Sequence, residues 1–291
     1  MALQDFTGRT AVITGAGSGI GRGMALHAAA EGMQVVISDV EQGALAETRD
    51  LVLAAGAEAL AVRTDVGDPD AVDALADAAF ERFGAVHLVH NNAGVFQAGI
   101  SWQRTLADWE WVLRVNFWGV LHGVKAFVPR LLDQEQRARE SGGTDGDIHI
   151  VNTSSLAGIT TVAYSGPYVV SKFACAALTE CLAHDLRAQG STIGVSCLVP
   201  GAVDTRIAQS TRNRPDEPPG EAQAGDHWFV AEALGSMTAE RGIPPVDAAR
   251  MVFDGIRAGQ FWICTTDAYD AILAPRCEAL LAHRLPPGAE Y

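Results

Sequence analysis

Tyr168 and Lys172 are the pair of residues in this chain best suited to acid–base chemistry. They stand four positions apart, so on a helix both side chains would lie on one face. A phenol is ordinarily too weak an acid to lose its proton near neutrality, and a neighbouring ammonium favours the phenolate form. Lys172 is one of only two lysines in a chain that otherwise uses arginine, which suggests a requirement for a compact ammonium. The pair predicts a tyrosine that exchanges a proton with a substrate.

A glycine-rich turn is the second candidate site. Residues 14–21 read TGAGSGIG, directly after an apolar segment and at the start of a helical one. The glycines would let the backbone approach a pyrophosphate, and the helix N-terminus would offer free N–H groups and a favourable dipole. Any tight strand–helix corner can use glycine, but this position between a strand and a helix favours a dinucleotide site.

Asp39 ends the second apolar segment, QVVISD, 20 residues after Gly19. An acid at this spacing can bond the hydroxyls of an adenosine ribose, and its charge would repel a 2′-phosphate. Neither Ser18 in the glycine turn nor Val40 after the acid supplies a positive charge to offset it. These residues favour NAD over NADP as the cofactor. The alternative is an acid that only caps the next turn.

The elements that would position these residues alternate along the chain. Short apolar segments predict strands over 10–14, 34–38, 59–63, 86–90, 148–153, 193–199 and 261–265. Amphipathic stretches predict helices over 19–32, 43–55, 69–83, 109–132, 168–187, 246–258 and 268–283. This alternation predicts an α/β fold, a Rossmann-like doubly wound parallel sheet of about seven strands with helices on both faces in a three-layer sandwich. Without an internal repeat or a dividing linker, residues 1–291 are expected to form a single domain.

Two segments break the alternation. Residues 134–146 are polar and glycine-rich and are expected to form a surface loop. Residues 206–225 are proline-rich and lead into the apolar stretch His227–Leu234. They follow the sixth strand, at the end of the sheet where such folds bind ligands. Residues 206–240 are therefore interpreted as a substrate lid, with a disordered excursion as the alternative.

Composition argues against several other functions. The 291 residues carry a formal net charge of −14 and their basic residues are scattered, which argues against nucleic-acid binding. No signal peptide or apolar run of membrane-spanning length is evident, so a cytoplasmic protein is expected, with no membrane partner. Five cysteines without CxxC spacing and eight histidines without an HExxH set predict neither a disulfide framework nor a metal site.

In these features the chain resembles the short-chain dehydrogenase/reductase family, over roughly residues 7–205. TGAGSGIG matches the family's glycine turn, and YVVSK at 168–172 matches its YxxxK signature. The other matches are Asp65-Val66, NNAG at 91–94, NFWG at 116–119, SSLAG at 154–158 and PGAVDT at 200–205. The resemblance implies an oxidoreductase that moves a hydride between nicotinamide and an alcohol or ketone.

The resemblance also implies a role for each matched residue. Ser155, preferred over Ser154 by its spacing from Tyr168, would orient the substrate carbonyl, and Tyr168 would transfer the proton. Lys172 would hold the ribose and favour the phenolate, and Asn116 would hold a water that relays protons to solvent. Besides Tyr168 and Lys172, the expected cofactor contacts are Gly15, Gly17, Ser18, Gly19, Ile20, Gly21, Asp39, Val40, Asp65, Val66, Asn92, Ala93, Gly94, Pro200, Gly201, Val203 and Thr205.

The substrate pocket is expected to be mostly apolar and to take a bulky hydrophobic or aryl secondary alcohol, or the matching ketone. Tyr164 lacks a lysine four positions on, so it is interpreted as a pocket wall rather than a catalyst. The expected pocket residues are Phe96, Gln97, Ser155, Ala157, Tyr164, Tyr168, Val203 and Trp228. Helices 109–132 and 168–187 resemble those that pair between the family's subunits, so a homodimer or homotetramer is expected.

Three alternatives stay open. An epimerase or dehydratase on the same scaffold would usually carry TGxxGxxG and a longer substrate domain, and this chain has neither. An NADP-dependent ketoreductase would use the other cofactor. A non-catalytic NAD-binding regulatory protein would have no need of the serine, tyrosine and lysine together.

Overall fold

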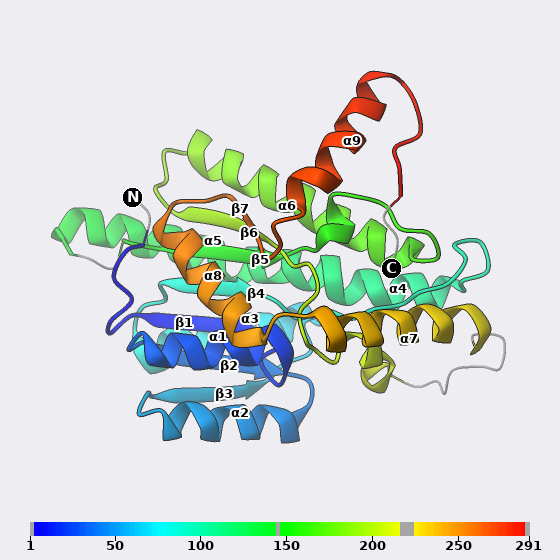
Figure 1. Ribbon diagram of the computed structural model, residues 1–291. Coiled ribbons are helices and arrows are strands. Elements are labelled where there is room, and N and C mark those ends of the chain that lie inside the picture. Colours follow the sequence, from blue (N-terminus) through cyan, green and yellow to red (C-terminus); the bar gives the residue numbers. More distant parts are fainter. Residues whose placement is uncertain (1–2, 144–145, 216–223, 289–291) are drawn as a thin grey trace.

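A parallel sheet of seven strands forms the centre of the computed structural model, which describes residues 3–143, 146–215 and 224–288. The strand order is β3-β2-β1-β4-β5-β6-β7 (Figure 1). From β1 the chain winds outward to β3, then returns to β4 and winds the other way to β7, as predicted for a doubly wound sheet. The strands are β1 (Thr10–Thr14), β2 (Gln34–Asp39), β3 (Ala59–Arg63), β4 (Leu88–Asn91), β5 (His149–Thr153), β6 (Gly194–Val199) and β7 (Trp262–Cys264).

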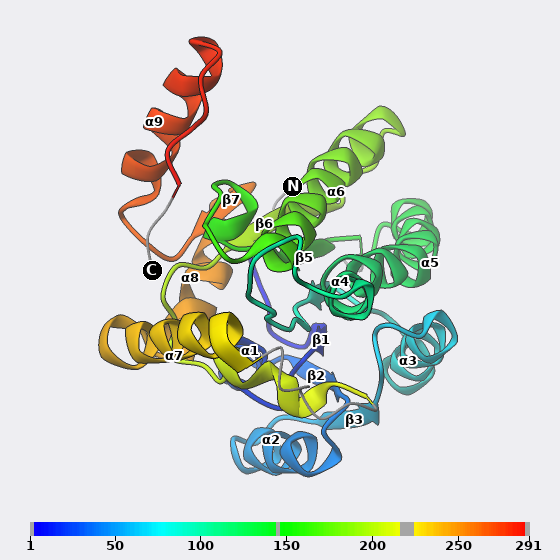
Figure 2. The same ribbon diagram turned by 90° about the vertical axis from the view of Figure 1, so that its right-hand side faces the viewer.

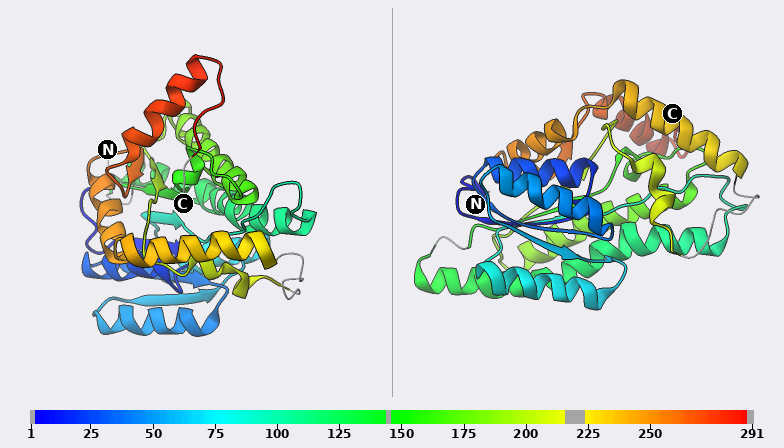
Figure 3. Two further views of the ribbon diagram at one scale, coloured as in Figure 1. Left: turned by 45° about the vertical axis from the view of Figure 1, so that its right-hand side comes forward. Right: turned by 90° about the horizontal axis from the view of Figure 1, so that it is seen from below.

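Helices cover both faces of this sheet (Figures 2 and 3). One face carries α1 (Gly19–Ala30), α2 (Gln42–Ala54) and α8 (Pro245–Arg257), and the other carries α3 (Pro69–Phe83), α5 (Gly119–Ser141) and α6 (Gly166–Ala188). Every residue of β1 and of β5 is buried, as expected for parallel strands covered on both sides. The predicted three-layer Rossmann-like fold is confirmed.

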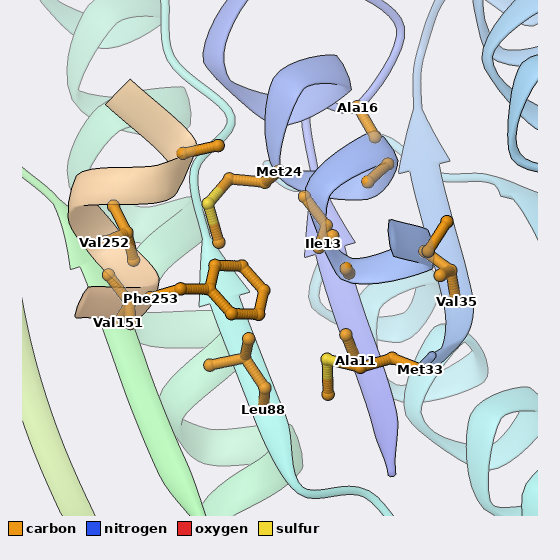
Figure 4. Packing of buried hydrophobic residues seen from close by; sticks show 14 of the residues in the cluster. Ala11, Ile13, Ala16, Met24, Met33, Val35, Leu88, Val151, Val252 and Phe253 are labelled. Carbon is orange, nitrogen blue, oxygen red and sulfur yellow. The ribbon is translucent and has the colours of Figure 1, made fainter. Parts of the chain in front are cut away.

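Each face of the sheet has its own apolar core. Along β1, Ala11 and Ile13 belong to the core beneath α1 and α8, and Val12 belongs to the core beneath α3, α5 and α6. This alternation follows from the period of two in a strand. In the first core, the ring of Phe253 on α8 lies among Met24, Leu88 and Val151 (Figure 4).

The helical segment expected over 109–132 differs most from prediction. It consists of α4 (Leu106–Leu113), a π-helical turn η1 (Arg114–Trp118) and α5, which runs on to Ser141. The predicted loop over 134–146 is therefore wrong for residues 134–141. The Gln134 side chain bonds the N–H and C=O of Val86, at 3.0 and 2.9 Å, and Glu135 accepts from the Thr192 N–H at 2.6 Å. These polar residues are good helix formers, and their side chains bond neighbouring segments of the same chain.

The segment after β6 lies over the carboxyl ends of the strands (Figure 1). It contains the 3-10 helix η3 (Ile207–Asn213) and the helix α7 (Ala224–Arg241); the part of the expected lid at 216–223 lies outside the described residues. A short helix η2 (Leu156–Gly158) follows β5, and the final helix α9 (Tyr269–Leu281) projects beyond the β7 edge (Figure 2). None of the helices described is both long and apolar enough to span a bilayer.

Candidate active site

A cavity of about 720 Å³ lies at the carboxyl ends of the strands. The loops that follow β1 to β6 line it, together with η3, α7 and the start of α9. Doubly wound folds bind ligands at this edge of the sheet, and the volume suits a small molecule. Within the described ranges, no three His, Cys, Asp or Glu side chains form a group that could hold a metal ion.

The glycine turn joins β1 to α1 at one end of this cavity. Gly15 and Gly19 have φ angles of +65° and +51°, which residues other than glycine rarely adopt. A Cβ on Gly15 would stand 2.7 Å from the Cα of Ala93, so only glycine lets the turn pack against the loop after β4. The turn therefore leaves open backbone next to the N-terminus of α1, a suitable cradle for a phosphate group.

Asp39 ends β2 beside this turn. One carboxylate oxygen accepts from the Gly17 N–H at 2.8 Å, and the other accepts from the Glu41 N–H at 2.9 Å. Burial raises the pKa of this carboxyl above its ordinary value, although the two backbone N–H groups act in the opposite direction. The carboxylate is thereby held in a defined orientation on the cavity wall.

Two further contacts build the floor of this end. The Asn92 amide nitrogen donates to the Thr14 C=O at 3.0 Å, which ties the loop after β4 to β1. Asp65, after β3, accepts from the Arg114 guanidinium at 2.8 Å. Asn92, Asp65 and Arg114 all line the cavity.

The acid–base pair lies at the other end, on the first turns of α6. Lys172 is buried, and its Nζ donates to the Thr153 C=O at 2.9 Å. The same nitrogen lies 5.7 Å from the centre of the Tyr168 ring, whose edge packs against Phe96 with centroids 5.0 Å apart. Ser155, at the start of η2, lines the cavity with them. A hydroxyl, a phenol and an ammonium thus share one end of the cavity.

The two neighbouring serines have different hydrogen bonds. The Ser154 hydroxyl is buried and donates to the Lys172 C=O at 2.8 Å. The Ser155 oxygen accepts from the Ala157 N–H at 3.1 Å, a bond that does not use the hydroxyl hydrogen. This difference favours Ser155 as the hydroxyl that can donate to a ligand.

Asn116 lies in η1 and is fully buried. Its amide nitrogen donates to the Val95 C=O and to the Ser171 Oγ, both at 2.9 Å, and its amide oxygen accepts from the Val95 N–H at 2.8 Å. The Ser171 hydroxyl donates in turn to the Tyr168 C=O at 2.7 Å. Both amide hydrogens are in use, so this side chain fixes α6 against the loop after β4. The expected water relay stays a prediction.

Most of the residues expected to contact cofactor or substrate line the cavity. These are Gly15, Ser18, Gly19, Ile20, Asp39, Val40, Asp65, Val66, Asn92, Ala93, Gly94, Phe96, Ser155, Ala157, Tyr168, Lys172, Pro200, Gly201, Val203 and Thr205. Gly17, Gly21 and Asn116 are not among the residues that line it.

Three residues expected in the substrate pocket do not line it: Gln97, Tyr164 and Trp228. The Gln97 side chain is buried and its amide nitrogen bonds the Ala98 C=O. Tyr164 and Trp228 are 53% and 49% exposed. The side chains of α7 that do line the cavity are Leu234, Met237 and Thr238, more than one turn further along the helix.

Sequence reasoning missed several lining residues. Leu234, Met237 and Thr238 show the i, i+3, i+4 spacing of one helix face, and this signal could have identified them. Ile272 comes from α9, far along the chain, and no local pattern marks it. Glu41, Arg212 and Asn213 also line the cavity, through contacts that only the fold creates.

A buried and a partly buried ion pair attach η3 and α7 to the segment after β4. Arg104 donates to Asp226 at 2.9 Å, and Arg214 donates to Asp108 at 2.5 Å. Burial tends to raise the pKa of the Asp108 carboxyl, but the hydrogen bonds from Arg214 and Thr105, together with the charge of Arg214, hold this pKa below its ordinary value. The Ala98 N–H also donates to the His227 Nδ1 at 3.2 Å.

Known proteins are similar to this chain in sequence and in architecture. The short chain dehydrogenase family model matches residues 9–216. A putative oxidoreductase SadH of Mycobacterium tuberculosis is 36% identical over 258 residues, 89% of this chain and 86% of that protein. A 1-deoxy-11-beta-hydroxypentalenate dehydrogenase of Streptomyces arenae is 38% identical over 205 residues, 69% of each chain. A short-chain dehydrogenase/reductase of Burkholderia phymatum, solved in complex with NAD, superposes with a TM-score of 0.90 at 41% identity over 99% of both chains.

Proposed function

The chain belongs to the short-chain dehydrogenase/reductase family, and from this premise we propose that it is an NAD-dependent oxidoreductase that interconverts hydrophobic secondary alcohols and ketones. One observation carries the proposal. Ser155, Tyr168 and Lys172 meet at one end of a cavity whose other end holds the glycine turn and Asp39. Such a cavity can hold a dinucleotide along its length and a second ligand beside the acid–base pair.

The residues at the glycine turn fit NAD. The close packing of Gly15 on Ala93 leaves backbone next to the N-terminus of α1 for a pyrophosphate. The Asp39 carboxylate is oriented by two N–H groups and can accept from ribose hydroxyls, whereas it would repel a 2′-phosphate. The similarity to a protein solved with NAD supports the same cofactor here.

The chain's own residues would move the proton. When bound, the nicotinamide supplies the hydride acceptor or donor. In the oxidation direction the phenolate form of Tyr168 takes the alcohol proton and becomes the neutral phenol, and the Ser155 hydroxyl donates a hydrogen bond to the substrate oxygen. Lys172, anchored on the Thr153 carbonyl, would stabilise the negative charge that the Tyr168 oxygen carries before it takes this proton.

The wall beside this pair favours a hydrophobic substrate. Phe96, Val162, Leu234, Met237 and Ile272 contribute apolar side chains to it. A bulky or aryl secondary alcohol would transfer apolar surface from water into contact with these residues, which favours binding. A relative named as a hydroxypentalenate dehydrogenase supports a hydroxyl-bearing substrate.

Turnover of a panel of alcohols and ketones with NAD(H) and NADP(H) tests the proposal. We expect preference for NAD and for apolar secondary alcohols. Tyr168→Phe removes the proton-transferring oxygen and is expected to lower kcat by about 10²–10⁴-fold while NADH binding is retained. Tyr164→Phe is the matched control, since Tyr164 does not line the cavity. Undiminished turnover in Tyr168→Phe, or preference for polyols or acids, would contradict the proposal.

A further inference from the structure

Glu41 connects the loop after β2 to η3 at the edge of the cavity. It lies just after β2, two residues beyond Asp39, and its Oε1 accepts from the Arg212 Nε at 2.9 Å and from the Asn213 Nδ2 at 3.0 Å. Arg212 and Asn213 are the last residues of η3. Glu41, Arg212, Asn213 and Asp39 all line the cavity. Residues more than 170 positions apart in the sequence are therefore in contact at the end of the cavity that holds the glycine turn.

The middle of η3 is attached to the segment after β4. The Ser210 Oγ accepts from the Phe96 N–H at 3.0 Å, and Phe96 packs on Tyr168. The Arg212 guanidinium also donates to the C=O groups of Arg206 and Gln209, which fixes its direction within η3. The helix thus contacts both Glu41 and Phe96, the residue that packs on Tyr168.

We propose that Glu41 is a positioning residue that closes η3 over the adenosine half of bound NAD, slows release of the cofactor, and keeps Arg212 away from a 2′-phosphate. This inference rests on the proposed function. The contact from Glu41 to Arg212 and Asn213 is named the clasp.

The clasp has two consequences. A dinucleotide seated along the cavity lies beneath η3, so the cofactor leaves faster when the clasp is open. The second consequence concerns charge. Arg212 lines the same cavity as Asp39, and a guanidinium there would attract a 2′-phosphate if it were not paired with Glu41. Glu41 therefore adds to the discrimination that Asp39 exerts by repulsion.

The size of the effect follows from exposure. The Glu41 and Arg212 side chains are 27% and 29% exposed, so solvent weakens their attraction without abolishing it. Loss of one charge-assisted hydrogen bond in such a setting corresponds to about a tenfold change in an equilibrium or rate.

Stopped-flow fluorescence of NADH release from the purified full chain tests the clasp. In Glu41→Gln we expect release about tenfold faster and a KM for NAD raised by a similar factor, with the KM for the alcohol unchanged. The KM for NADP should fall, because Arg212 is freed. Arg212→Gln should accelerate release equally but should not improve the use of NADP, because the guanidinium is gone. A merely structural role would not produce this split.

Glu47→Gln is the matched control. Glu47 on α2 pairs with Arg22 at 3.0 Å and does not line the cavity, so release should stay at the wild-type rate. Wild-type release rates in both Glu41→Gln and Arg212→Gln would overturn the clasp. If Glu41→Gln does not fold, Asn213→Ala removes one arm of the same contact and should also speed release. Failure of the wild type to bind NADH would instead overturn the proposed function.

Discussion

The two ends of the cavity are built in different ways. At the glycine-turn end, backbone groups and neighbouring strands set the geometry: the Gly17 N–H holds Asp39, and Asn92 bonds the adjacent β1. At the acid–base end, the outer wall is formed by α7 and by the part of η3 that contacts Phe96, while the last residues of η3 contact Glu41 at the other end. Side-chain ion pairs attach this wall to the segment after β4. The Arg104–Asp226 and Arg214–Asp108 pairs each join residues more than 100 positions apart. The glycine-turn end is part of the sheet, whereas the outer wall of the acid–base end is attached to the sheet by side chains.

This difference predicts that the two ends can be damaged separately. A change in a buried ion pair should alter the substrate wall and overall stability while the dinucleotide cradle persists. A change at Asp39 should alter cofactor binding while the substrate wall persists. The expected effects below run from the largest to the smallest.

Breaking the Arg214–Asp108 pair is expected to have the largest effect. The two side chains are only 7% and 0% exposed, so Arg214→Leu leaves a buried carboxylate without this cation. Removing one partner of a buried pair costs about 3–5 kcal/mol of unfolding free energy, which lowers Tm by roughly 10 °C in a chain of this size. Calorimetry measures this change, and kinetics should give a raised KM for the alcohol.

The matched control for this prediction is Arg250→Leu. Arg250 is 57% exposed and pairs with Asp247 at 3.6 Å, so its loss should cost less than about 1 kcal/mol. In the double variant Asp108→Asn/Arg214→Leu, neither charge of this pair remains, and part of the stability should return. Equal losses in Arg214→Leu and Arg250→Leu would remove the basis for treating the substrate wall as attached by buried pairs.

Asp39→Ala tests the other end. The change removes a carboxylate that would accept from ribose hydroxyls, and a charge-assisted hydrogen bond contributes about 1.5–3 kcal/mol. We expect the KM for NAD to rise about 10–100-fold and the preference over NADP to narrow. The KM for the alcohol should change little. Steady-state kinetics with both cofactors measure the split, and an unchanged ratio of NAD to NADP efficiency would count against Asp39 as the ribose acid.

The same division explains what could be predicted from the sequence. The glycine turn, Asp39 and the Tyr168–Lys172 pair are local patterns, and the seven strands follow from short apolar segments; the structure brings these residues to one cavity. The substrate wall depends on contacts between distant segments, so its residues were predicted less well. Ile272 reaches the cavity because α9 starts beside β7, and the chain around it carries no motif.

Polar composition was misleading at the C-terminal end of α5. Residues 134–141 were expected to form a loop because they are charged and polar, yet they extend α5. The Glu135 carboxylate accepts from the Arg139 guanidinium one turn later at 2.8 Å, and it also bonds the distant Thr192. Helix propensity indicated the correct structure here, and polarity did not.

Leu234→Ala is expected to have the smallest effect and discriminates between two positions on one helix. Leu234 lines the cavity, whereas Trp228, expected from the sequence to contact substrate, does not. Shortening a side chain in an apolar pocket costs about 1–3 kcal/mol of binding, so kcat/KM should fall roughly tenfold for alcohols that fill the cavity. The kcat/KM for small alcohols, which do not fill the cavity, should be nearly unaffected. The affinity for NADH should also change little, because the cradle at the glycine turn is separate. Trp228→Ala is the control and should leave both parameters unchanged. A larger loss of kcat/KM in Trp228→Ala than in Leu234→Ala would place the substrate against the N-terminal part of α7. The apolar wall that includes Leu234 would then not select the substrate.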